Sequence, residues 1–154
     1  IIGGEFRRFR PLVELYRETG IRSGYSLDQL KVGIHALGYV AATTRDAAED
    51  FYPGYARAFN TVGKERGWPP VTRAQFETQL EPDGALLVGN AEEVVEKIGR
   101  YNEALGGISR ITFMMNAASL PHEKLMQAIE AIGTRVAPVL RQGLVAEANL
   151  HQRA

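Results

Sequence analysis

The chain has 154 residues, which is enough for one compact domain with a buried core. Its 18 basic and 18 acidic residues cancel, so its charge gives no reason to expect binding to nucleic acid or to a membrane surface. It contains no cysteine, which excludes disulfides, thiolate nucleophiles and thiolate metal ligands. No apolar run approaches the roughly 20 residues of a transmembrane helix. We expect a cytoplasmic protein, because the lack of cysteine fits a reducing compartment.

The first residues, Ile1 and Ile2 followed by Gly3 and Gly4, have the pattern of a buried strand that ends in a loop. A chain that starts inside a strand predicts further sequence upstream. The glycine pair has two interpretations. It lines a ligand-binding mouth at the end of the strand, or it forms a turn that needs positive φ angles.

A helix is predicted for residues 9–19, where Pro11 suits the first turn and three apolar residues have helical spacing: Leu12, Leu15 and Tyr16. A strand follows over residues 30–41, which alternate between two sets of side chains. Few residues of either set are charged. We therefore expect this strand to be covered on both faces, as strands of parallel sheets are.

Thr43 or Thr44 is expected to cap a helix that runs to about Lys64 and carries three aromatic residues at four-residue spacing, Phe51, Tyr55 and Phe59. The Gly-Trp-Pro-Pro sequence around Trp68 breaks this helix. We expect Trp68 to anchor the loop by packing, with a substrate lid as the alternative. A short helix is predicted over residues 72–79.

The apolar triplet Leu86-Leu87-Val88 and Gly89 lead into a helix that begins at Asn90. Asn90 as N-cap and Glu93 three residues later form a predicted capping box. Glu92 and Glu93 are therefore expected to stabilise the positive end of the helix, rather than to act as paired catalytic carboxylates.

The second clear strand is predicted for residues 108–117, and the last helix begins at residues 119–121. Pro138 is expected to end or bend that helix. The order of strand end, helix, strand, helices, strand and helix predicts an α/β fold with parallel strands. Two strands and a strand end cannot close a barrel or cover their own edges.

Several common sites lack their motifs. Neither GxGxxG nor GxxxxGK[ST] occurs, and no serine–histidine pairing points to a hydrolase. His122 and Glu123 are adjacent in sequence, so they do not share a helical face and are not a metal pair. No metal site is predicted.

The stretch Leu86–Ile98 resembles the late helix start of luciferase-like monooxygenases, in which an apolar triplet, a glycine and a small capping residue precede an acid-rich helix. Three further segments are similar to the same family in the same order: Ile1–Gly4, Lys31–His35 and Leu120–Lys124. Two others are similar to a branch of the family with unassigned substrates: Phe51–Tyr55 and Arg66–Pro70. Together they cover nearly the whole chain except its C-terminal end.

The resemblance implies a flavin-binding (β/α)8 TIM barrel with reduced FMN, or the deazaflavin F420, at its C-terminal mouth. Residues 1–140 would form the C-terminal part of that barrel, from the end of the sixth strand to the final helix, and residues 141–154 a polar C-terminal tail. The family's main phosphate-binding loop, after the fifth strand, would lie upstream of Ile1. We therefore expect this fragment alone to be inactive and to bind flavin weakly or not at all.

His35 is the candidate catalytic residue. It lies toward the C-terminal half of its strand, near the end where barrel enzymes place their active sites, and its imidazole suits hydrogen bonding or proton transfer. The alternative is a buried histidine satisfied by a neighbouring side chain. Gly38, farther along, would let a planar ring approach the backbone, or would mark a bulge.

On the second strand, Thr112, Met114 and Asn116 are predicted to share one face. Asn116 at the strand end and Met114 against the flavin ring are candidate cofactor contacts, together with Gly3, Gly4 and Gly38. For Met114 the alternative is core filling.

These observations predict a flavin-dependent monooxygenase or related oxidoreductase that uses FMN and a small-molecule substrate. One alternative is an F420-dependent oxidoreductase of the same barrel class, which would transfer hydride without oxygen. Another is a non-catalytic α/β module that associates through its strand edges. The expected partner is the missing N-terminal part of the barrel or a second copy of the chain, with no nucleic acid and no membrane.

Overall fold

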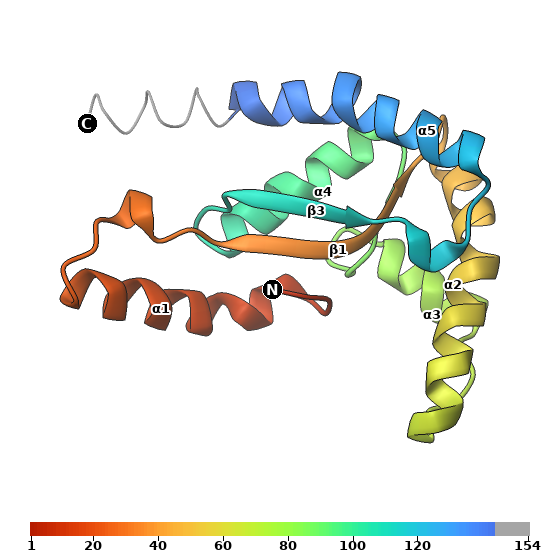
Figure 1. The fold of residues 1–154 in the computed structure, drawn as a ribbon, viewed down its shortest axis with the longest axis horizontal. Coiled ribbons are helices and arrows are strands. Elements are labelled where there is room, and N and C mark those ends of the chain that lie inside the picture. The colour runs from red at the N-terminus through yellow and green to blue at the C-terminus, as the bar shows by residue number, and fades with distance from the viewer. Residues whose placement is uncertain (144–154) are drawn as a thin grey trace.

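The computed structural model describes residues 1–143. A parallel sheet lies between helices (Figure 1), with α1 and α5 on either side of it in this view and α2 and α3 beyond the carboxyl ends of β1 and β3. The helices and strands, in chain order, are η1 Phe6–Phe9, α1 Arg10–Arg22, η2 Leu27–Gln29, β1 Gly33–Val40, α2 Thr44–Arg66, α3 Arg73–Leu80, β2 Leu87–Gly89, α4 Ala91–Ala104, β3 Arg110–Met114, η3 Asn116–Ala118, α5 His122–Ala131 and η4 Ile132–Val136.

The strand order is β2-β1-β3, and both pairings are parallel. His35 of β1 is opposite Thr112 of β3, and an isolated bridge joins His35 to Ile2 on the other edge. The predicted parallel α/β arrangement is confirmed. The apolar triplet after residue 85 was expected only to lead into a helix, but Leu87–Gly89 forms a strand beside the end of β1.

The core consists of two clusters. In the first, Ile34 and Ala36 of β1 and Val32 just before it pack against α4, and α1 contributes Val13 to the same cluster. The second surrounds the carboxyl end of β1 and α2 and contains Tyr39, Phe51, Tyr55 and Phe76. The burial of β1 alternates over its first five residues. The expectation that this strand is covered on both faces is therefore met only in part: His35 and Leu37 are half-buried, and Leu37 packs against the second cluster.

The predicted starts of α2, α3 and α4 are confirmed, and each of these three is fixed by a side-chain cap. The hydroxyls of Thr43 and Thr72 accept backbone N–H groups at the starts of α2 and α3, and Asn90 accepts the Glu93 N–H at 2.9 Å. The predicted capping box at Asn90 is only half formed, because the Asn90 backbone N–H donates to Thr44 Oγ1 of α2 at 3.1 Å instead of to Glu93. This bond joins α4 to α2.

Pro138 does not end the last helix. Residues 137–143 are still helical, and a π-helical turn, closed by the Ala137 N–H donating to the Ile132 carbonyl, lies directly before the proline. Residues 141–143 of the predicted polar tail continue this helix, and its residues 144–154 lie outside the described part of the chain.

Trp68 does not anchor its loop by burial, because its side chain is 50% exposed. Its ring instead faces the Arg66 guanidinium, with 5.0 Å between the guanidinium carbon and the ring centroid. Over residues 1–143, no helix combines the length and the apolar composition needed to cross a bilayer.

Candidate functional site

The candidate site is the face of the sheet that the described helices leave uncovered. Side chains alternate along parallel strands, so His35 and Leu37 of β1 lie on the same face as Thr112 and Met114 of β3. His35, Leu37 and Met114 are half-buried, and Thr112 is exposed. The face is therefore accessible and carries a titratable imidazole between a hydroxyl and a thioether.

His35 and Met114 are in direct contact. His35 Nε2 lies 3.3 Å from Met114 Sδ. A thioether can only accept a hydrogen bond, so in the tautomer that carries its proton on Nε2 the imidazole donates to Met114, and Nδ1 is then free to accept. The alternative interpretation of His35, a histidine satisfied by a neighbour, is thus partly observed, but the neighbour satisfies only one nitrogen.

Asn116 does not extend this face as predicted. β3 ends at Met114, and Asn116 is the first residue of the short helix η3, where strand alternation no longer applies. Its side chain is exposed and has no hydrogen bond within the described chain. The structure thus brings His35 and Met114 together, and places Asn116 two residues beyond the strand, on the loop at its carboxyl end.

The candidate glycines lie in different settings. Gly3 and Gly4 have φ angles of 64° and 79°, which supports a turn that needs positive φ at both positions. A Cβ added to Gly38 would lie 2.5 Å from Phe113 Cδ1. A planar ring does approach Gly38 closely, but it is the protein's own Phe113, which faces the first core cluster.

The carboxyl end of β1 is tied to two helices by a polar cluster. The Tyr39 hydroxyl donates to Asp50 of α2 at 3.1 Å, and the Lys124 ammonium of α5 pairs with the other oxygen of Asp50. Burial, followed by the hydrogen bond to Asp50, raises the pKa of Tyr39 to about 12. Tyr39 therefore stays neutral at physiological pH, and the cluster borders a cleft of about 320 Å³.

The loop that follows β3 is held against α2. A Cβ on Gly54 of α2 would lie 1.6 Å from the Ala118 carbonyl oxygen, so the helix and the loop backbone touch directly. The next residue, Ser119, has φ 51° and ψ 43°. The sequence placed Ser119 only at the start of the last helix, which begins at His122 instead. It gave no sign of this conformation, because serine is not a residue that the left-handed region favours.

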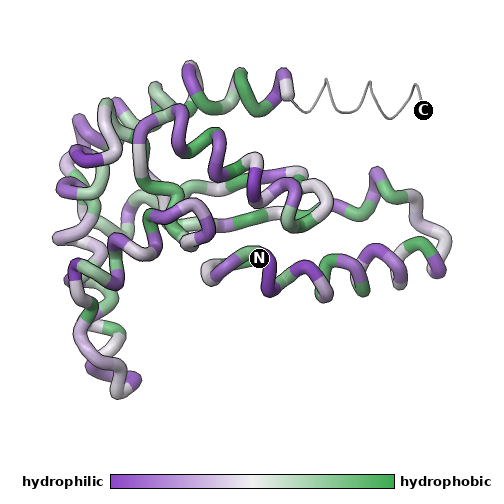
Figure 2. Tube along the Cα trace, turned by 180° about the vertical axis from the view of Figure 1, so that it is seen from behind, coloured by the Kyte–Doolittle hydropathy of each residue, from purple (hydrophilic) through white to green (hydrophobic). Residues whose placement is uncertain are grey.

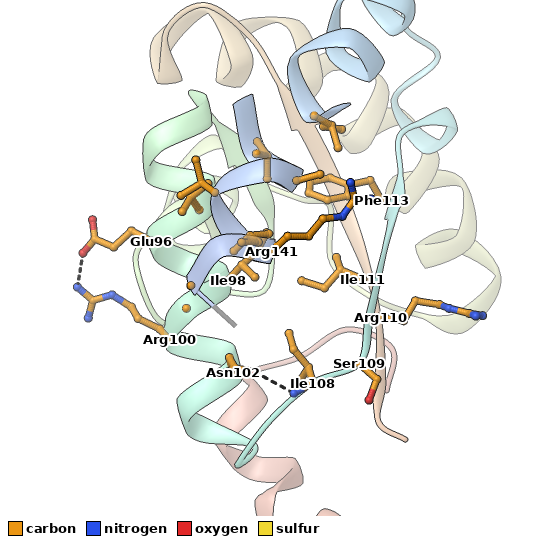
Figure 3. A pocket seen from close by; sticks show the side chains of 18 of the residues that line it. Glu96, Ile98, Arg100, Asn102, Ile108, Ser109, Arg110, Ile111, Phe113 and Arg141 are labelled. Carbon is orange, nitrogen blue, oxygen red and sulfur yellow. Dashed lines mark hydrogen bonds and ion pairs between the residues drawn. The ribbon is translucent and has the colours of Figure 1, made fainter. Parts of the chain in front are cut away.

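A further cavity lies elsewhere. A groove of about 800 Å³ runs between α4, β3 and the last helix, and Figure 3 shows Ile111 and Phe113 pointing into it while Arg110 points away. It is on the side of β3 opposite the His35 face. Its lining is mainly aliphatic, and Figure 3 shows the Arg141 side chain extending across it toward Phe113.

Lys97 is the buried charged residue of α4, with 6% of its surface exposed. Its ammonium donates to the carbonyls of Gln79 and Leu80 at 3.1 and 3.2 Å, and so caps the C-terminal end of α3. Burial lowers the pKa of Lys97 to about 8. The predicted structural role of Glu92 fits its ion pair with Arg135 at 3.0 Å. Across residues 1–143, no group of three or more acidic or histidine side chains is arranged to hold a metal ion.

The fold is similar to part of two solved monooxygenases. One is the oxygenating constituent of 3,6-diketocamphane monooxygenase from the CAM plasmid of Pseudomonas putida, a type II Baeyer-Villiger monooxygenase in complex with FMN. It matches with a TM-score of 0.63 and 23% identity over 89% of this chain and 41% of that chain. The other is monooxygenase RslO1 from Streptomyces bottropensis, with a TM-score of 0.68 and 16% identity over 90% of this chain and 40% of that chain.

This chain therefore spans about two fifths of the length of each solved structure. No family model and no curated protein matches the sequence. The likeness confirms that the fold of this chain is shared with part of these two monooxygenases.

Proposed function

We propose that residues 1–140 form the C-terminal part of a (β/α)8 barrel in an FMN-dependent monooxygenase or oxidoreductase. The observation that carries this proposal is the uncovered face of β1 and β3, which presents His35, Thr112 and Met114 although the opposite face is packed by helices. In a closed barrel this face would point inward, and substrates bind at the carboxyl ends of the strands.

Three further surfaces support an incomplete barrel. Among the described strands, β3 pairs only with β1, so its other edge has no neighbour. The groove of Figure 3 opens beside this same strand. The third surface is on α1, which lies beyond the edge of β1 opposite β3. Of its residues only Val13 is buried, while Leu12 is 62% exposed. Figure 2 shows apolar segments along α1, and its residues Leu12 and Tyr16 border a cavity beside Ile1.

The residues of the site fit the ring of a flavin and do not fit its phosphate. The thioether of Met114 and the side chain of Leu37 offer apolar contact, and His35 Nδ1 offers a hydrogen-bond acceptor. The cations on this face, Lys31 and Arg110, lie at the amino ends of their strands, opposite the end where a barrel binds its ligand. Lys124, at the carboxyl end of β1, is already paired with Asp50. The phosphate site would therefore come from the rest of the barrel.

A bound flavin supplies the hydride or oxygen chemistry in such enzymes. The role of this chain is to position the flavin and the substrate and to accept protons. His35, with its Nε2 proton directed to Met114, keeps Nδ1 available to accept a proton or to hydrogen-bond the ligand. The uncovered face would become shielded from water when the barrel closes, which strengthens each of these interactions.

Two other functions remain alternatives. An F420-dependent oxidoreductase would use the same face, and the FMN in one structural neighbour favours FMN. A non-catalytic association module is favoured by the free edge of β3. Extraction of the cofactor from the full-length gene product, followed by its absorbance spectrum and mass, tests all three. FMN supports the proposal, F420 supports the first alternative, and a protein without cofactor or turnover that self-associates tightly supports the second.

A further inference from the structure

Ser119 has an unusual backbone conformation for its residue type. With a φ of 51°, it is the one non-glycine residue with positive φ among residues 1–143. This region costs a residue with a Cβ about 1 kcal/mol, and glycine or asparagine adopts it more readily. On local energetics alone, a serine is a poor choice at this position.

The surrounding packing imposes the conformation. The two neighbours of Ser119 are buried, with Ala118 4% and Leu120 9% exposed. Ala118 is held against Gly54 of α2, and the Ser119 backbone N–H donates to the Asn116 carbonyl at 3.2 Å. The serine side chain, by contrast, is exposed and has no hydrogen-bond partner in the described chain. The turn therefore does not need the hydroxyl for its own stability.

The turn places the Ser119 hydroxyl where a ligand would bind. It follows the carboxyl end of β3, on the side of the sheet where barrel enzymes bind their ligands. Asn116 and Ser119 are its exposed polar residues, and residues 115–121 contain no charged side chain. A hydroxyl and a carboxamide on a loop that carries no cation of its own suit a neutral acceptor better than a phosphate or a carboxylate.

We infer that Ser119 is a ligand-binding residue whose hydroxyl donates a hydrogen bond to a neutral carbonyl or hydroxyl oxygen of the flavin or of the organic substrate. This inference rests on the proposed function, because the ligand binds only where the barrel has its mouth. It gives Ser119 a hydrogen bond to the ligand, which accounts for a serine at a position where glycine would remove the backbone strain.

The test uses the full-length gene product and its Ser119→Ala and Ser119→Gly variants. FMN affinity is measured by quenching of flavin fluorescence, and affinity for cyclohexanone, as a neutral ketone probe, by the change in absorbance of the bound flavin. Loss of one hydrogen bond weakens binding about five- to tenfold. Weaker FMN binding in both variants assigns the contact to the flavin. Unchanged FMN binding with weaker cyclohexanone binding assigns it to the substrate.

Ser109→Ala is the matched control, because Ser109 is an exposed serine at the amino end of β3 and should change neither affinity. Thermal unfolding checks the backbone premise separately: Ser119→Gly should unfold at a higher temperature than Ser119→Ala. If both affinities stay unchanged, or if the glycine variant unfolds first, the inference is overturned. A wild-type protein that binds no FMN contradicts the proposed function itself and this inference with it.

Discussion

His35 Nε2 and Met114 Sδ lie 3.3 Å apart, across two neighbouring strands and on the face of the sheet that the described helices leave open. This contact fixes the imidazole but buries it only in part. Ile34, the residue before His35, points to the other face of the sheet and is 2% exposed. Adjacent residues of one strand thus separate the site from the core.

We predict that His35→Ala costs less than about 1 kcal/mol of unfolding free energy, since a half-exposed side chain with one weak contact is lost. Ile34→Ala should cost about 2–5 kcal/mol, because it leaves a cavity in the first core cluster. Urea denaturation of both variants measures the difference. In the complete enzyme His35→Ala should lower turnover more than stability. If His35→Ala unfolds as readily as Ile34→Ala and keeps its specific activity, His35 is a structural residue.

Gly54→Ala is expected to lower the free energy of unfolding by about 3 kcal/mol or to prevent folding, because its Cβ would lie 1.6 Å from the Ala118 carbonyl oxygen. Gly99→Ala is the matched control in α4, where an added Cβ meets no atom within 4 Å. That variant should gain up to about 1 kcal/mol from helix propensity. Thermal unfolding of the two variants decides the point. Equal stability of the two would mean that α2 does not rest on the loop after β3.

Lys97 should make stability depend on alkaline pH. Burial lowers its pKa from 10.5 to about 8 in the folded protein, so the folded state favours the neutral amine. Its contribution to stability is therefore fully present above about pH 10.5 and is lost as the pH falls through 8. Relative to Lys97→Met, the wild type should become more stable as the pH rises from 7 to 10. Denaturant titrations at several pH values measure this difference, with the exposed Lys64→Met as a control that shows no such trend. A difference that is flat with pH would contradict the burial of the ammonium.

The open surfaces predict that the isolated chain associates. A contiguous apolar patch above about 500 Å² is unusual on a monomer, and the free edge of β3 can pair with another strand. Light scattering at micromolar concentration should show dimers or larger species. Thr112→Lys, which adds a charge to the open face, should shift them toward monomer, whereas Thr61→Lys on the exposed surface of α2 should not. A wild-type chain that stays monomeric would mean that other residues cover the open face.

Local signals predicted the elements well. The starts of α2 and α4 followed from Thr43 and Asn90, because N-capping is a contact within one turn. The alternation of β1 and the parallel order followed from the sequence of elements. β2 escaped prediction because three residues are too few for a periodic pattern, and its pairing with Gly38 and its neighbours is a long-range contact.

The site was harder to predict because its geometry depends on other elements. The apolar pattern of β1 suggested two covered faces, but coverage depends on which helices exist to pack against each face. Asn116 was assigned to the strand by extrapolating alternation past Met114, where contact with α2 turns the chain into η3 instead. Ser119 carries no local signal, since its conformation is set by the burial of its two neighbours.

FMN titration by calorimetry tests the central claim most directly. The full-length gene product should bind one FMN per chain with a Kd below about 1 μM, an affinity that corresponds to about 8 kcal/mol. Residues 1–154 alone should bind at least about 100-fold more weakly, because the face of His35 and Met114 holds no phosphate site. A full-length protein without measurable FMN affinity would contradict the proposed function. Sub-micromolar binding by the isolated chain would contradict the claim that the rest of the barrel supplies the phosphate site.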